Sequence, residues 1–163
     1  MPAEPIDPAD YTGEDDSSFL TWLDGSPSHE QCSLTLREFY PDATTFSQFQ
    51  RIFTGRMQPV LRMLHLPSLF STMAMALANP GNVPKSVEAV LLCFCLATVS
   101  TMSQNQCQAV LNHDRASVVR KYKKVATQAL TNAGFVQHPD LTSLQALSLY
   151  LVCFKNMVHV LQI

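Results

Sequence analysis

The chain has 163 residues, of which 47% are apolar and 15% are charged, and its formal net charge is −2. This length supports one domain with a modest core, while the charged fraction lies below the roughly 25% that is usual in globular proteins. A net charge near zero excludes a general attraction to nucleic acid or to anionic membranes.

The near-neutral total hides an uneven distribution of charge. Residues 1–36 contain eight acidic residues and no Lys or Arg, whereas the rest of the chain contains five acidic residues and all 11 basic ones. Because acidic residues repel one another and prolines interrupt helices, we predict a largely disordered acidic arm over residues 1–45. A helical domain is expected over residues 46–163.

One segment of the arm, Asp15–Asp24, combines acidic with bulky apolar residues and holds the only Trp of the chain. Its side chains Phe19, Trp22 and Leu23 are candidate contacts for a partner protein. Neighbouring acids keep such side chains solvated, so the segment can fold onto a hydrophobic groove of a partner. The alternative is that these side chains dock on the chain's own helical domain, and the sequence leaves both interpretations open.

The first half of the predicted helical domain contains three helices. Residues Phe46, Phe49, Ile52 and Phe53 recur at helical spacing and should form one apolar face, and Gly55 is a plausible end of that helix. A short helix is predicted over Pro59–Leu64. Another is predicted over Leu69–Ala78, ended by the turn residues that follow it.

The second half contains three longer helices. Val87–Met102 is apolar on nearly every side, which predicts a central, buried helix with Ser86 as its N-cap. Asp114 should cap the next helix and Gly134 should end it, with an apolar stripe of Val118, Tyr122, Val125, Ala129 and Leu130. Asp140 should cap the last helix, whose large apolar residues recur at Leu144, Leu147, Leu151 and Phe154.

These patterns contain no convincing strand, so we predict an all-α fold, an irregular helical bundle of about six helices. The helix capped by Asp114 carries a basic face made of Arg120, Lys121, Lys123 and Lys124. This face is a candidate phosphate-binding or nuclear-import element. A solvated helix face is the favoured alternative, because the core-facing Tyr122 interrupts the strip and leaves a weak nucleic-acid footprint.

The sequence contains no convincing catalytic or metal-binding constellation. His113 and Asp114 are adjacent, but Asp114 stands where a helix cap is expected. Cys93 and Cys95 point about 200° apart on a helix, so they cannot share a metal ion and are expected to pack in the core. We therefore predict no enzymatic activity, no metal and no cofactor.

The sequence also indicates where the protein resides. Five cysteines, an odd number, favour free thiols in a reducing compartment. The longest strongly apolar run, Ala89–Val99, is shorter than the roughly 20 residues that span a bilayer, and the acidic N-terminus does not read as a signal peptide. We expect an intracellular, soluble protein without membrane contact.

Three segments in a fixed order carry a family resemblance: Gln58–Ser68, Lys85–Cys107 and Val118–Leu151. The first ends in a His65-Leu66-Pro67-Ser68 turn. The second leads from an apolar helix into a polar stretch that ends at Cys107. The third contains the pairs Lys121-Tyr122 and Ala129-Leu130 and the helix start Asp140–Leu147. Together they resemble the fungal-specific transcription factor domain, the regulatory region of the fungal binuclear zinc cluster transcription factors.

This resemblance implies an all-α regulatory domain of a nuclear transcription regulator, and many family members control secondary-metabolite gene clusters. Two departures limit it. The family's DNA-binding element needs six closely spaced cysteines with basic residues between them, whereas residues 1–36 contain only Cys32. Family members also continue past Leu151 into further helices, so the chain resembles a truncated regulator.

We therefore expect a transcription regulator fragment that acts through protein contacts rather than by sequence-specific DNA binding of its own. Helices that lack their usual neighbours would leave apolar faces exposed, which predicts marginal solubility, self-association or pairing with a full-length relative. The alternative is a generic α-helical interaction module unrelated to transcription. A small helical enzyme is a third possibility, for which the sequence offers no nucleophile–base pair.

Overall fold

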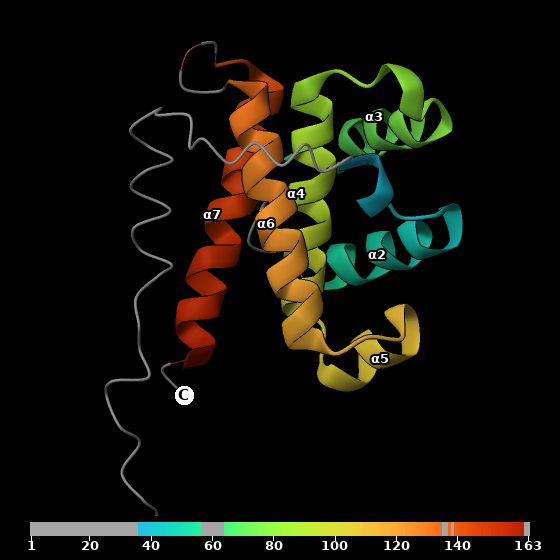
Figure 1. Cartoon of the computed structure of the whole chain (residues 1–163), viewed down its shortest axis with the longest axis vertical. Coiled ribbons are helices and arrows are strands. Elements are labelled where there is room, and N and C mark those ends of the chain that lie inside the picture. Colours follow the sequence, from blue (N-terminus) through green and yellow to red (C-terminus); the bar gives the residue numbers. More distant parts are fainter. Residues whose placement is uncertain (1–35, 57–63, 135–136, 138, 162–163) are drawn as a thin grey trace, which may run out of the picture. The chain divides into compact units, whose positions relative to one another are not determined.

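The computed structural model describes residues 36–56, 64–134, 137 and 139–161, with only the backbone for 154–161. These residues form six α-helices, two short 3-10 helices and no β-strand (Figure 1). The prediction of an all-α fold with about six helices is confirmed. Residues 1–35, to which the prediction of a disordered arm chiefly applies, lie outside the described residues.

Helix α4 (Lys85–Thr101) lies at the centre of the helical unit (Figure 1). Every side chain from Ala89 to Ser100 is at most 7% exposed, as the uniformly apolar sequence predicts. The two buried hydroxyls do not lack partners, since Thr98 donates a hydrogen bond to the Phe94 carbonyl and Ser100 to the Ala97 carbonyl. The apolar side chains of this helix therefore supply the middle of the core.

Helices α2 (Ala43–Arg56) and α3 (Leu66–Ala78) pack against α4 through aromatic rings. The Phe94 ring of α4 lies 5.0 Å from Phe53, 5.8 Å from Phe46 and 5.7 Å from Phe70, measured between centroids. The predicted apolar face of α2 is confirmed, with three buried phenylalanines and a half-buried Ile52.

Helices α6 (Arg115–Ala133) and α7 (Leu141–Leu161) pack on α4 (Figure 1). Helix α6 begins and ends, and α7 begins, where the sequence predicts. The Asp114 carboxylate accepts a hydrogen bond from the Ser117 amide at 3.3 Å, and Asp140 accepts one from the Ser143 amide at 2.6 Å. Gly134 ends α6 with a φ of 62°, a left-handed conformation that favours glycine.

Three local predictions were wrong. Gly55 lies inside α2, which runs to Arg56, and so does not end that helix. Helix α4 begins at Lys85 after Pro84, so Ser86 lies inside the first turn rather than at the cap; proline, with its fixed φ and no N–H to satisfy, suits a helix start. A separate helix, α5 (Gln104–Leu111), follows α4 where only a polar stretch was expected. The predicted helix Pro59–Leu64 falls almost entirely in 57–63, outside the described residues.

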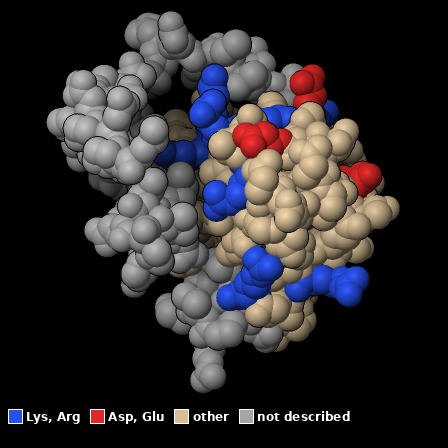
Figure 2. All heavy atoms as spheres, turned by 90° about the horizontal axis from the view of Figure 1, so that it is seen from below, with Lys and Arg blue, Asp and Glu red and all other residues tan. Residues whose placement is uncertain are grey.

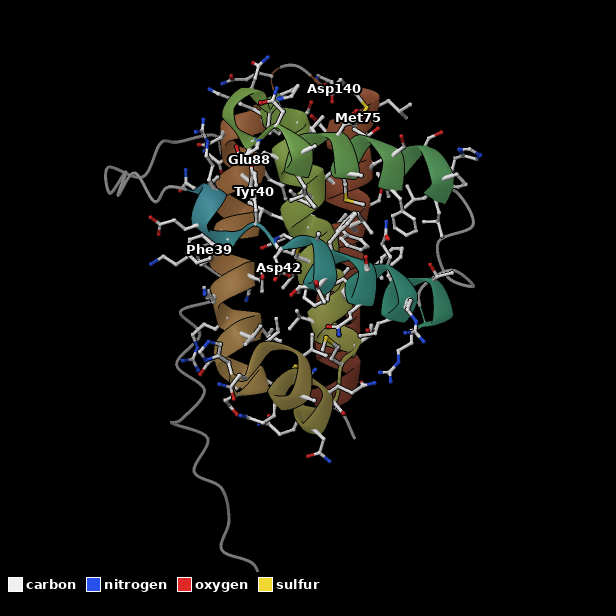
Figure 3. The ribbon with its side chains drawn as sticks, turned by 90° about the vertical axis from the view of Figure 1, so that its right-hand side faces the viewer. Phe39, Tyr40, Asp42, Met75, Glu88 and Asp140 are labelled. Carbon is white, nitrogen blue, oxygen red and sulfur yellow. The ribbon has the colours of Figure 1, made fainter. Side chains whose placement is uncertain are left out.

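The described helical unit begins before residue 46. A 3-10 helix, η2 (Leu36–Phe39), buries Leu36, and the neighbouring Tyr40 hydroxyl donates a hydrogen bond to Glu88 of α4 at 2.9 Å (Figure 3). A second 3-10 helix, η3 (Pro80–Asn82), connects α3 to α4. Residues 36–45, which we assigned to the arm, therefore pack against the helices, because Leu36 and Tyr40 provide anchors that the proline count did not reveal.

The large apolar residues that recur along α7 do not all face the core. Leu144 is 47% and Leu151 is 45% exposed. The buried side chains of α7 are instead Ser143, Ala146, Leu149, Tyr150 and Cys153. Residues 141–153 contain no charged residue, so polarity does not select a face, whereas small side chains allow α7 to lie close to α4.

Candidate protein-interaction surface

Helix α6 is amphipathic, as the sequence predicts. The five residues of its predicted apolar stripe are all buried. Arg120, Lys121 and Lys124 are exposed, and Lys123 is half-buried. In the face shown in Figure 2, basic side chains stand apart on a largely uncharged surface. The four basic residues thus lie outside the apolar stripe of α6 and are exposed or half-buried.

One residue of this basic face is already engaged within the chain. The Lys121 ammonium lies 4.9 Å from the centre of the Phe39 ring, a cation–π contact. The adjacent Tyr122 hydroxyl donates a hydrogen bond to the Phe39 carbonyl at 3.5 Å. Lys121 therefore helps to hold η2 against α6, and Arg120 and Lys124 are the more accessible charges.

The outer face of α7 is apolar. Leu141 is 74% exposed, and together with Leu144 and Leu151 it lies on one side of the helix, within about 80° at 3.6 residues per turn. That side points away from the buried residues of α7. A solvent-facing helix normally carries charged residues there, so this row of three leucines is suited to contact with another apolar surface.

The row of leucines and the basic face are held in a fixed register. Helices α6 and α7 run antiparallel, joined by the short connection that follows Gly134 (Figure 1). The hydroxyls of Thr127 and Tyr150 lie 2.9 Å apart and link the middle of α6 to the middle of α7. Lys124 lies three residues before Thr127, and Cys153 lies three residues after Tyr150. Because the two helices are antiparallel, Lys124 is at about the level of Cys153.

Two guanidinium groups position the turn between α4 and α6. Arg115 donates hydrogen bonds to the carbonyls of Met102 and Ser100, each at 2.8 Å. Arg56 of α2 donates to the Thr101 carbonyl. Cations at a helix C-terminus complement its dipole and its unpaired carbonyls. Sequence reasoning missed both contacts, because no local pattern links an arginine to a helix end 13 to 45 residues away.

The cysteines of the described region behave as core residues. Cys93, Cys95, Cys107 and Cys153 are free and buried. In the part of the chain that the structure describes, no group of three His, Cys, Asp or Glu side chains is placed to hold a metal ion. Burial raises the pKa of the Cys93 and Cys95 thiols well above the usual value, and that of Cys153 to about 12. Since a buried, protonated thiol is a poor nucleophile, we expect Cys93, Cys95 and Cys153 to be unreactive in the folded state.

We expect alkylation to distinguish folded from unfolded chain at these cysteines. At pH 8, iodoacetamide should leave Cys93, Cys95 and Cys153 unmodified until denaturant is added, as peptide mapping by mass spectrometry would show. Folding raises these pKa values, so the unfolded chain loses thiol protons first. The part of the free energy of unfolding that depends on these protonated thiols should therefore be fully present below about pH 9 and should be lost at higher pH.

The check is urea unfolding under reducing conditions at pH 7.5 and pH 10. A Cys95→Ala variant is the control and should show a weaker dependence on pH, because it has one titrating thiol fewer. Equal midpoints for the wild-type chain at the two pH values, or rapid alkylation of the native chain, would contradict the prediction.

The other predicted residues are accounted for as follows. Phe19, Trp22 and Leu23 lie outside the described residues, so their role stays a prediction. Asp114 caps α6, as preferred over an acid–base role with the exposed His113. None of the described helices is both long enough and apolar enough to cross a lipid bilayer.

Comparison with known proteins relates the chain to fungal regulators. It is 26% identical over 148 residues to the pyriculol/pyriculariol biosynthesis cluster transcription factor 1 of Pyricularia oryzae, covering 91% of this chain and 19% of that protein. It is 31% identical over 114 residues to the transcription factor vrtR2 of Penicillium aethiopicum, covering 68% of this chain and 14% of that protein. The chain is a relative of fungal transcription factors.

A further fungal regulator shows the same relation. The C6 finger domain transcription factor adaR of Aspergillus niger is 30% identical over 129 residues, which cover 76% of this chain and 16% of adaR. The chain thus spans less than a fifth of the length of these regulators. No protein-family profile and no solved structure matches it.

Proposed function

We propose that this chain is a transcription regulator, or the regulatory part of one, that acts through protein contacts in the nucleus. The observation that carries this proposal is the similarity of 68–91% of the chain to proteins named as fungal transcription factors. The resemblance to the fungal-specific transcription factor domain supports the same assignment. No sequence-specific DNA binding by these 163 residues is proposed, because they lack the closely spaced cysteines of the zinc cluster.

The proposal extends to the process regulated. Two of the relatives are named for the pyriculol/pyriculariol and aurofusarin clusters. A role in control of a secondary-metabolite gene cluster therefore follows as the more specific proposal for this chain. The partner contacts proposed are Phe19, Trp22 and Leu23, with the basic face of Arg120, Lys121, Lys123 and Lys124 as an accessory surface.

The test is a tethered reporter assay in a filamentous fungus. The full chain is fused to a heterologous DNA-binding domain, and transcription of a reporter with the matching sites is measured. We expect the fusion to change reporter output. Trp22→Ala should reduce the effect of the fusion on reporter output at least several-fold, because Trp residues at the centre of an interface commonly contribute about 2 kcal/mol or more of binding energy.

Thr21→Ala, one position away, is the matched control and should leave reporter output near that of the unmodified fusion. Microscopy of a fluorescent fusion without the added DNA-binding domain reports where the chain accumulates. Nuclear accumulation is expected. An inert reporter fusion together with cytoplasmic fluorescence would favour the generic helical interaction module and would contradict the proposal.

A further inference from the structure

The row of leucines on α7 is exposed and lies on an uncharged part of the helix, which bears on what could bind to it. Leu141, Leu144 and Leu151 point away from the core and are 45–74% exposed. Between residues 141 and 153 no side chain carries a charge. Two copies of such a surface can meet without bringing like charges together on α7, which is the first requirement of a self-complementary contact.

The spacing of these residues favours an antiparallel pairing. If two α7 helices meet at the midpoint of the row, Leu141 of one copy lies opposite Leu151 of the second copy. Leu144 then lies opposite the small, exposed Ser148 of the second copy, which leaves room for the larger side chain. A two-fold axis between the helices produces both contacts twice, as closed symmetric dimers require.

The charges beside the row are complementary in the same arrangement. Antiparallel pairing about this midpoint brings residue 140 of the second copy level with about residue 152. Lys124 of α6 is level with about Cys153, as the hydrogen bond between Thr127 and Tyr150 fixes. Lys124 and Asp140 are both exposed, so in this arrangement each Lys124 lies at about the level of the Asp140 of the other copy and is free to pair with it. The Asp140 carboxyl is ionised at neutral pH, and hydrogen bonding to Ser143 lowers its pKa further.

From this geometry we infer that the outer face of α7 binds a second copy of the chain as an antiparallel, two-fold symmetric dimer. Leu141, Leu144 and Leu151 form its centre, and Lys124–Asp140 pairs form its two ends. The contact is small compared with the roughly 800 Å² per partner of stable interfaces. The dimer is therefore weak, with a Kd on the order of micromolar. This inference is independent of the transcription role, because it concerns the purified chain alone.

Sedimentation equilibrium of the full chain between about 1 and 200 µM tests the dimer, with circular dichroism to confirm folding. The mean mass should rise from one chain toward two. Leu144→Glu should raise the Kd at least tenfold, since it places a charge in the apolar contact of both copies. Met75→Glu is the control, because Met75 is also an exposed apolar residue, 72% exposed, but lies on α3 (Figure 3); it should leave the Kd unchanged.

The charge pairs need their own variants. Lys124→Glu should weaken the dimer, and the second change Asp140→Asn should restore part of the affinity, because it removes the new repulsion while asparagine keeps the helix cap. A mass that stays at one chain at every concentration would overturn the inference, whatever else covers this face. So would a dimer that survives Leu144→Glu, or one in which Asp140→Asn restores nothing to the Lys124→Glu chain.

Discussion

Phe94→Ala is expected to lower the free energy of unfolding by about 3–5 kcal/mol, the usual cost of removing a large buried ring. The Phe94 side chain is fully buried in α4, and three rings from two other helices surround it, the nearest centroid 5.0 Å away. Alanine would leave a cavity that α2 and α3 cannot close without moving. Natural domains are stable by about 5–15 kcal/mol, so a loss of this size would remove a large part of the total.

Urea unfolding followed by circular dichroism at 222 nm measures this effect. Phe94→Leu should cost much less than Phe94→Ala, because leucine fills most of the space left by the ring. It keeps the prediction testable if the alanine variant does not fold. Met75→Ala, on the exposed side of α3, is the control and should change stability by less than about 0.5 kcal/mol. A loss below about 1 kcal/mol for Phe94→Ala would show that the aromatic cluster is not a rigid part of the core.

Arg115→Ala is expected to cost about 2–4 kcal/mol, since hydrogen bonds to a charged donor contribute about 1.5–3 kcal/mol each and are not additive. The guanidinium donates to the carbonyls of Ser100 and Met102, two residues that are themselves buried. Without it, the C-terminal end of α4 has unpaired carbonyls that water reaches poorly. The turn into α5 also loses the cation that complements the dipole of α4.

The same unfolding measurement, with two further variants, identifies the cause. Arg115→Lys keeps the charge but cannot reach both carbonyls with the planar geometry of a guanidinium, so an intermediate loss is expected. Arg120→Ala removes an exposed arginine from the same helix and should cost less than about 0.5 kcal/mol. If Arg115→Ala costs no more than Arg120→Ala, the two hydrogen bonds do not stabilise the fold.

Much of the helical unit was predictable because the deciding signals are local. The caps at Asp114 and Asp140, the end of α6 at Gly134 and the apolar stripe of α6 all depend on residues within one or two turns. The burial of α4 followed from its uniformly apolar composition. The assignment of Cys93 and Cys95 to the core was correct. It rested on their positions on opposite sides of one helix, from which the two side chains cannot bind the same metal ion.

The missed elements fall into two groups. Helix α5 carries a capping box between Ser103 and Gln106, a signal that the sequence contained and that could have been used. The attachment of η2 through Leu36 and Tyr40, and the two arginines at the end of α4, had no local signal. These contacts join residues 13 to 48 positions apart, and only the packing of the helices brings them together.

The sequence by itself determined that this chain is helical, where most of its helices begin and end, and which regulators it resembles, because helix periodicity, caps and segment order are written along the chain. Which side of α7 faces the core was decided only in three dimensions. That helix is uncharged all round from residue 141 to 153, so its sequence gives the core no preferred side. Close contact with α4 selected the small side chains Ser143, Ala146 and Cys153 and turned Leu144 and Leu151 outward, and this outward row supplies the proposed dimer contact.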